Sequence, residues 1–358
     1  MRLPKAKRIN VENYIRVQNT LKIRRGSVKL SANESALGPS PKAIKEYNKV
    51  SKNFKRYPDT NGNILRETIA KNFNLDSSRV ILGAGSDQIL ELVCNAFLEK
   101  NDEVIVPKFS FIIYRLYSKK KGAKVILAKE ENFKISVKNI LSLVTKKTKI
   151  IFLANPNNPT GTFINKKEIL FLRKKLRNNI LLVIDDAYCE YPNKKDYKSG
   201  LEIFSKYKNV LITRTFSKIY GLAGLRVGWG YSSKDIINSL NKVKPPFNVS
   251  RPALFAATAS IKDKNWLKKE IKHVAKWRKI FYKVFQELKI DTNETHGNFF
   301  LLKFDDVKLS SNFIFKALLK SGILVRKMDI YGIKNSLRVT IGTSKENKKF
   351  IKAIKRLI

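Results

Sequence analysis

Short runs of apolar residues alternate with longer stretches of helical periodicity between about residue 60 and residue 245. Apolar runs of this length, bounded by turn residues, are typical of strands that are buried on both faces. The runs lie at 79–83, 102–107, 123–128, 148–154, 180–185, 209–215 and 225–231. Strands that alternate with helices indicate a mainly parallel sheet covered by helices on both faces, so we predict the α/β class.

The stretches between the runs have the spacing of amphipathic helices. One follows the turn RYPDTNG and places a set of residues on one helical side, namely Ile64, Leu65, Thr68, Ile69 and Phe73. After residue 245 the pattern changes, because long lysine-rich helices from Ala253 to Gln286 precede three short apolar runs. That layout predicts a smaller α+β domain. We therefore expect an N-terminal arm over 1–30, a large domain over 31–245 and a small domain over 246–358.

The composition fits a globular chain with a substantial core, since 43% of the 358 residues are hydrophobic. No apolar run approaches the ~18 residues of a membrane-spanning helix, and the basic N-terminus lacks the apolar stretch of a secretory signal. The two cysteines (Cys94 and Cys189) and two histidines (His273 and His296) have no metal-ligand spacing and are too few for a disulfide framework. We expect a cytoplasmic protein with no metal and no membrane partner.

The net charge of +44 raises the alternative of nucleic-acid binding. Lysine greatly outnumbers arginine, and the basic residues are spread along the whole chain instead of forming a block with interleaved aromatic residues. Specific readers of nucleic acid concentrate arginine at defined positions. We therefore attribute the charge to compositional drift and expect no specific nucleic-acid partner.

Polar clusters follow several of the predicted strands, where open α/β sheets bind ligands. The motif ILGAGSDQ (81–88) places Gly83 and Gly85 before a helix. The first backbone amides of that helix could hold a phosphate, or the two glycines could serve only a tight turn. The motif NPNNPTG (155–161) combines amide donors with rigid prolines, which indicates a ligand loop or a structural turn. Either motif alone leaves both interpretations open.

Two further motifs carry ionisable groups. Asp185 and Asp186 end an apolar run, and neighbouring strand residues point to opposite sides, so we expect one acid at a pocket and the other at a helix or in solvent. A helix cap or a surface pair is the alternative. The stretch RTFSKIYGLAGLRVGWG (214–230) surrounds Lys218 with hydroxyl groups and an arginine. These groups suit a phosphate beside a reactive lysine.

Together the motifs resemble, over nearly the whole chain, the aminotransferase class I/II family of fold-type I enzymes that use pyridoxal 5'-phosphate (PLP). The resemblance rests on SANESALGPSPKA, RYPD, NPNNPTG, DDAY, TFSKIYGLAGLRVG, GILVR and LRVTIGT. It implies a PLP-dependent transferase fold of type I, with a large and a small domain, and a homodimer. Within the family, the motifs look most like the histidinol-phosphate aminotransferase branch, which acts in histidine biosynthesis.

The resemblance implies catalytic roles for three residues. Lys218 matches the lysine that forms the Schiff base with PLP and then moves a proton between the substrate Cα and C4′ of the cofactor. Asp185 matches the acid that pairs with the pyridine nitrogen, which keeps the ring an electron sink. Tyr188 and Asn158 match the hydrogen-bond donors to the 3-oxygen of the cofactor.

The resemblance also implies how the cofactor is held. Ala187 matches the residue against one ring face, and Phe109 matches the aromatic residue against the other. The residues that match the phosphate-binding set of the family form what we call the phosphate cup: Gly85, Ser86, Asp87, Thr215, Ser217 and Arg226.

Four residues match substrate and subunit contacts of the family. Arg338 and Arg326 match arginines that hold a substrate anion, and Asn33 matches a residue of the loop that closes over the substrate. Tyr57 matches a tyrosine that reaches the phosphate from the partner subunit. We expect small-molecule substrates and a homodimer with shared sites.

The chain departs from the branch in two places. Tyr14 is followed by IRVQNT where the branch carries a Pro-Gly-Lys stretch, and DDAY replaces the commoner DEAY. Our leading hypothesis is transamination of histidinol phosphate with 2-oxoglutarate and glutamate as the partner pair. An aromatic amino-acid aminotransferase, a phospho-amino-acid decarboxylase of the same fold, and a basic nucleic-acid-associated protein with a degenerate enzyme fold remain the alternatives.

Overall fold

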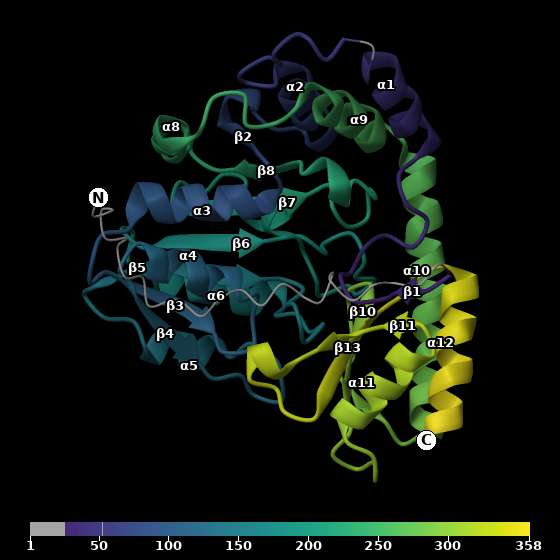
Figure 1. Cartoon of the computed structure of the whole chain (residues 1–358). Coiled ribbons are helices and arrows are strands. Elements are labelled where there is room, and N and C mark those ends of the chain that lie inside the picture. Colours follow the sequence, from purple (N-terminus) through teal and green to yellow (C-terminus); the bar gives the residue numbers. More distant parts are fainter. Residues whose placement is uncertain (1–25, 52) are drawn as a thin grey trace, which may run out of the picture.

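The computed structural model describes residues 26–51 and 53–358 (Figure 1). Its centre is a sheet of seven strands: β2 (Val80–Gly83), β3 (Glu103–Pro107), β4 (Lys124–Ala128), β5 (Thr148–Ala154), β6 (Leu181–Asp185), β7 (Val210–Thr215) and β8 (Gly228–Tyr231). The strand order is β2-β8-β7-β6-β5-β3-β4. The strands from β7 to β4 are parallel, whereas β8 runs antiparallel to both of its neighbours.

Helices cover both faces of this sheet because its strands are apolar on both sides. Along β5, Ile150 and Phe152 join the cluster beneath α3 (Ser86–Phe97), α4 (Ile113–Lys120) and α8 (Lys234–Val243). Ile151 and Leu153 point the other way, into the cluster beneath α5 (Val137–Ser142), α6 (Lys166–Lys175) and α7 (Gly200–Phe204). Helices α6 and α7 each begin with a capping box, which fixes where they start.

A second, antiparallel sheet follows in the C-terminal part. It consists of β9 (Asp291–Thr292), β10 (Phe299–Lys303), β12 (Arg326–Lys327) and β13 (Ser336–Thr340), in the order β12-β13-β10-β9. Helices α10 (Lys264–Glu287), α11 (Ser311–Lys320) and α12 (Ser344–Leu357) lie beside it (Figure 1). The short strand β1 (Val28–Lys29) pairs in parallel with β11 (Ile323–Leu324). The mainly parallel central sheet, covered by helices on both faces, confirms the predicted α/β fold class.

Three helices form the outer layer beside β2, namely α1 (Pro41–Ser51), α2 (Asn63–Phe73) and α9 (Arg251–Lys262). Leu65 and Ile69 of α2 are buried, whereas Ile64, predicted on the same side of the helix, is 39% exposed. The predicted lysine-rich helical stretch is two helices, because Asp263 ends α9 and caps α10 through the backbone NH of Trp266. Short 3₁₀ turns at Ser77–Arg79, Ala223–Leu225 and Asp329–Tyr331 complete the described elements.

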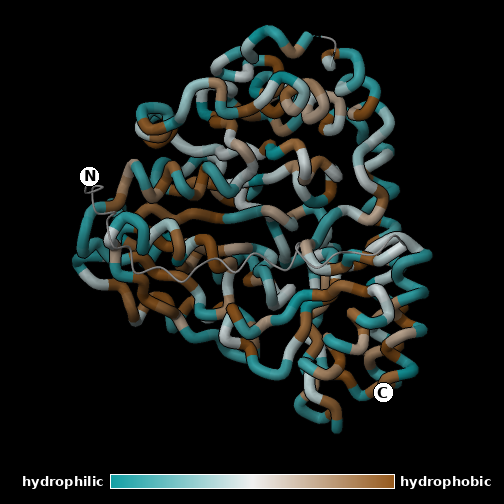
Figure 2. Tube along the Cα trace, in the orientation of Figure 1, coloured by the Kyte–Doolittle hydropathy of each residue, from teal (hydrophilic) through white to brown (hydrophobic). Residues whose placement is uncertain are grey.

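The hydrophobic core is continuous between the two sheets. Its largest cluster contains Ile184 of the central sheet together with Phe300 and Phe350 of the C-terminal part. Figure 2 shows hydrophobic residues concentrated in the central strands and hydrophilic residues along the outer helices and loops. The domain boundaries after residues 30 and 245 stay predictions. Tyr14 and most of the predicted arm lie outside the described residues.

Candidate functional site

A cavity of about 500 Å³ lies at the carboxyl ends of β5, β6 and β7. Parallel strands end at the same edge of a sheet, so residues far apart in the sequence meet there. Glu34, from the loop after β1, and residues of α4 complete the wall. Ten of the predicted site residues line the cavity: Ser86, Asp87, Asn158, Asp185, Ala187, Tyr188, Thr215, Ser217, Lys218 and Arg226.

Lys218 follows β7 by three residues, and its amine reaches the cavity wall. Its Nζ donates a hydrogen bond to the carbonyl oxygen of Ala32 at 3.0 Å. Burial, followed by the nearby charge of Arg338, lowers the pKa of Lys218 to about 8. The sequence had indicated Arg226 as the charged neighbour; Arg226 also lowers this pKa, but by less than Arg338. A lysine with this pKa has a neutral, nucleophilic fraction near neutral pH.

The two adjacent acids point in different directions. Asp185, at the end of β6, lines the cavity, where its Oδ2 accepts a hydrogen bond from the Tyr114 hydroxyl at 2.7 Å and its Oδ1 accepts one from Thr213 at 3.2 Å. Asp186 turns to the other side and accepts a hydrogen bond from the NH of Gly200, the first residue of α7, at 2.7 Å. Burial raises the pKa of Asp185, and it raises that of Asp186 to about 8. As expected from the sequence, one acid of the pair faces the pocket and the other faces a helix.

The phosphate cup is assembled from the start of α3 and the loop after β7. Gly85 precedes α3 with φ 81° and ψ 164°, and no side-chain hydrogen bond caps the helix. Uncapped NH groups at a helix N-terminus attract anions. A Cβ atom at Gly85 would lie 2.5 Å from Nη2 of Arg226, so the glycine lets the guanidinium approach. Arg226 donates from Nη1 to Ser217 Oγ at 3.3 Å, and Thr215 Oγ1 accepts the NH of Ser217 at 3.0 Å.

A network of polar side chains joins the opposite wall to β13. Asn33 donates from Nδ2 to the Tyr188 hydroxyl at 2.9 Å. Arg338 donates from Nη1 to Asn158 Oδ1 at 2.5 Å and from Nη2 to the Ser31 carbonyl at 2.9 Å. Burial raises the pKa of Tyr188 to about 12, so its hydroxyl stays protonated and available as a donor. The structure therefore brings Asn33 and Arg338 to the residues that line the cavity.

Arg326 and Arg338 are opposite each other on neighbouring antiparallel strands, β12 and β13. Both side chains are buried. This register brings two guanidinium groups together, and the family resemblance assigns both to a substrate anion.

Six predicted residues are not part of the cavity wall, namely Asn33, Tyr57, Gly85, Phe109, Arg326 and Arg338, and two of them have aromatic partners elsewhere. Phe109 stacks against Phe133, with ring centroids 5.5 Å apart, whereas the neighbouring Phe111 lies on the cavity wall. Tyr57 is 79% exposed and stacks on Phe247, with centroids 4.6 Å apart. The expected contact of Tyr57 with a partner subunit stays a prediction.

Helix α4 contributes residues that the sequence analysis missed. Tyr114 and Tyr117 line the cavity together with Phe111, and Tyr117 donates its hydroxyl to Asp87 Oδ2 at 3.0 Å. The three aromatic residues are three positions apart, which is the spacing of one helical face. That spacing, directly after a predicted strand, was a usable signal for this wall.

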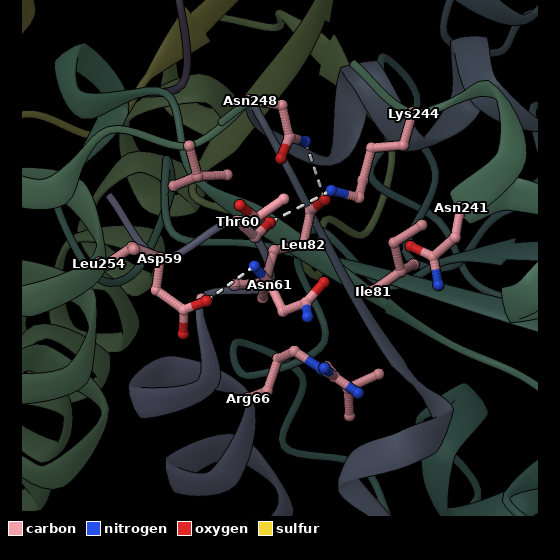
Figure 3. Close-up of a pocket in the computed structure, with 13 residues that line it drawn as sticks. Asp59, Thr60, Asn61, Arg66, Ile81, Leu82, Asn241, Lys244, Asn248 and Leu254 are labelled. Carbon is pink, nitrogen blue, oxygen red and sulfur yellow. Dashed lines mark hydrogen bonds between the residues drawn. The ribbon is translucent and has the colours of Figure 1, made fainter. Parts of the chain in front are cut away.

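A second, much smaller cavity lies beside α2 and the loop before α9 (Figure 3). Lys244 donates to the Thr60 carbonyl at 3.3 Å, and Asn248 donates to the Leu82 carbonyl at 3.0 Å. Its volume of about 20 Å³ holds roughly one water molecule, so it does not accommodate a substrate.

Comparison with known proteins decides the family. The model of the aminotransferase class I and II family matches residues 25–354. The chain belongs to this family. It is 48% identical to a histidinol-phosphate aminotransferase of Pelagibacter ubique over all of this chain and 99% of that protein. It is 41% identical to a histidinol-phosphate aminotransferase of Paramagnetospirillum magneticum over 92% of each chain. The family predicted from the motifs is confirmed.

Solved structures of the family share the fold. A histidinol-phosphate aminotransferase of Clostridium acetobutylicum superposes with a TM-score of 0.85 at 26% identity, covering 92% of this chain and 98% of that chain. One from Sinorhizobium meliloti, in complex with pyridoxal-5'-phosphate, has a TM-score of 0.85 at 22% identity and covers 93% of this chain and 92% of that chain. These superpositions confirm that the chain has the fold of this family, in addition to the predicted α/β class.

The described residues contain no group of His, Cys, Asp and Glu side chains placed to bind a metal ion. Within residues 26–51 and 53–358, every helix is too short or too polar to cross a bilayer. Both cysteines are buried with free thiols.

Proposed function

We propose that the chain is a PLP-dependent aminotransferase that moves an amino group between histidinol phosphate and the 2-oxoglutarate/glutamate pair, in histidine biosynthesis. One observation carries the proposal, namely that Lys218, Asp185 and Arg226 line a single cavity. The family membership supports the reaction class. The 48% identical relative that spans the whole chain supports the substrate.

The residues of the cavity fit PLP. The phosphate group matches the uncapped start of α3 and Arg226, whose approach depends on the missing Cβ of Gly85. The pyridine nitrogen matches Asp185, the buried acid of the wall, and the 3-oxygen matches Tyr188 and Asn158. Phe111 takes the role of the aromatic ring neighbour that the sequence analysis had given to Phe109. When bound, PLP supplies the electron sink that makes the Cα–H bond of an amino substrate acidic.

Lys218 is the residue that we expect to carry the covalent link and the proton. Its pKa of about 8 means that roughly a tenth of the amines are neutral at pH 7 in the absence of a ligand. With PLP bound, the same amine would be placed to take the proton from the substrate Cα and deliver it to C4′ of the cofactor, which is the proton shift that transamination requires. Asp185 holds the charge that keeps the ring nitrogen protonated, and the phosphate cup fixes the other end of the molecule.

The substrate anion is assigned to Arg338 and Arg326. Both are buried and face each other on adjacent strands, which suits a phosphate or a carboxylate better than a neutral group. Holding the anion fixes which Cα bond stands perpendicular to the ring, and orientation of this kind accounts for much of the rate of a positioned reaction. Asn33 closes the network through Tyr188.

We further propose a homodimer in which Tyr57 serves the site of the partner subunit. Tyr57 does not line the cavity of its own chain, and Phe247, on which it stacks, is 40% exposed. Exposed aromatic residues that lie together are typical of protein interfaces. A cytoplasmic location stays a prediction.

A substrate screen tests this function. The purified protein is loaded with PLP, and initial rates are measured with 2-oxoglutarate and either histidinol phosphate, phenylalanine or tyrosine. We expect the highest kcat/KM with histidinol phosphate. High turnover of the aromatic amino acids with none of histidinol phosphate would replace the substrate assignment by the aromatic aminotransferase. A protein that binds no PLP and stays colourless would refute the enzyme assignment itself.

A further inference from the structure

Tyr114 connects helix α4 to the acid of the cavity. Its hydroxyl donates to Asp185 Oδ2 at 2.7 Å, the shorter of the two side-chain hydrogen bonds to this carboxylate. The Tyr114 side chain is fully buried and its ring lies flat on Phe152 of β5, with centroids 4.9 Å apart and an interplanar angle of 1°. The hydroxyl is therefore held by the sheet and has little freedom to move away from the carboxylate.

The same tyrosine supports the aromatic wall. Phe111 packs edge-on against the Tyr114 ring, with centroids 5.7 Å apart at 89°. One buried side chain thus contacts both the acid that we assign to the pyridine nitrogen and the aromatic residue that we assign to one face of the cofactor ring. Serving both at once requires a side chain with a flat ring and a hydroxyl at its far end.

The hydrogen bond also acts on the charge of Asp185. Burial raises the pKa of this carboxyl, and the bond from Tyr114 is the largest influence that lowers it again. Thr213 and the NH of Ala187 act in the same direction, while Asp87 acts against them. A donor to the ionised form stabilises the charged carboxylate.

We propose that Tyr114 is a positioning residue for Asp185, fixing the carboxylate toward the cavity in its charged form while its ring backs Phe111. This inference rests on the proposed PLP chemistry, since only a ring nitrogen that needs a negative partner makes the position and charge of Asp185 matter.

The test begins with Tyr114→Phe, which removes the hydroxyl and keeps the ring. A hydrogen bond to a charged group contributes enough to change kcat about tenfold to a hundredfold when it is lost, so we expect a fall of that size. The KM for the amino donor should stay within about twofold, because the anion site is untouched. Tyr282→Phe is the matched control: the hydroxyl of Tyr282, in α10, donates to the Asn293 carbonyl at 3.1 Å and accepts the NH of Thr295, and Tyr282 does not line the cavity.

A double-mutant cycle separates positioning from a general structural role. The dissociation constant of PLP and the visible absorption band of bound PLP are measured for the wild type, Tyr114→Phe, Asp185→Asn and the double variant. We expect Tyr114→Phe to weaken PLP binding about threefold to tenfold in the wild-type background and to shift the band in the direction of Asp185→Asn. In the Asp185→Asn background the second change should have less than about a twofold effect, because its partner is gone.

The outcomes are distinct. Independent, multiplying effects of the two changes would overturn the inference, as would a Tyr114→Phe variant with wild-type kcat and an unshifted band. An equal loss of kcat in Tyr282→Phe would show that the loss in Tyr114→Phe comes from general destabilisation, and it would also overturn the inference. If the wild type is yellow and active while the cycle shows no coupling, the proposed function survives this failure; a colourless wild type removes both.

Discussion

Gly85 is the residue whose replacement tests the phosphate cup most sharply. Its φ of 81° and ψ of 164° fall in a region that is essentially restricted to glycine, where another residue costs about 1–3 kcal/mol. A Cβ atom at this position would also lie 2.5 Å from Arg226 Nη2 and 3.2 Å from its Cζ. In Gly85→Ala, the guanidinium must therefore move away from the start of α3, or the turn must shift.

The expected loss of PLP binding follows from that displacement. A hydrogen bond to a charged phosphate contributes about 1.5–3 kcal/mol, so its loss should raise the dissociation constant of PLP roughly 10- to 100-fold. The assay is a titration of the protein freed of PLP, followed by the visible absorption of the bound cofactor, with urea unfolding measured in parallel.

Gly122→Ala is the matched control. Gly122 also has a positive φ, 78°, but the nearest atom to an added Cβ is Lys100 Cγ at 3.4 Å, and the residue lies at the amino end of the sheet, away from the cavity. It should lose about 1–2 kcal/mol of unfolding free energy and bind PLP normally. Equal PLP affinity in Gly85→Ala and the wild type, with a stability loss like that of Gly122→Ala, would refute the assigned role of the cup.

Three further predictions follow from the ionic groups and the subunit arrangement. The pKa of Lys218 is lowered from 10.5 to about 8 in the folded protein, so the unfolded chain binds more protons between these two pH values. In urea unfolding at pH 7 without PLP, the free energy of unfolding of Lys218→Met should therefore be about 3 kcal/mol higher than that of the wild type. This difference should shrink as the pH rises from 8 to 10.5. Arg338→Lys should raise the KM for histidinol phosphate about tenfold or more, because an ammonium does not replace a bidentate guanidinium; an unchanged KM places the anion elsewhere. Mixing inactive Lys218→Ala with Tyr57→Ala subunits should restore about a quarter of the wild-type activity, since half of the dimers are mixed and each has one intact site; no gain on mixing argues against a shared site.

The sequence predicted the strands of the central sheet and the residues at their carboxyl ends well, for a physical reason. Buried parallel strands need continuous apolar runs, and polar residues directly after such runs must reach the edge of the sheet. Asp185, Lys218 and Arg226 could therefore be placed together without coordinates. The family resemblance added their roles, which strand patterns do not contain.

Three features of the structure were not predicted from the sequence. Phe111 lies in the turn between β3 and α4, outside regular structure, and only its three-residue spacing from Tyr114 and Tyr117 indicates that it faces the cavity. Ile64 fits the apolar side of its helix but is 39% exposed, which the helical period alone does not predict. Tyr114 was missed because its partner, Asp185, is 71 residues away in the sequence.

Chemical trapping of the cofactor tests the central claim most directly. The PLP-loaded protein is reduced with borohydride, digested, and mapped by mass spectrometry for the pyridoxyl group. The chain carries 55 lysines, so a lysine selected by its site must stand out against many other amines. Our account predicts one label per subunit, on Lys218, and no label there in Lys218→Met. A label spread over surface lysines, or a single label on a different lysine, would contradict it.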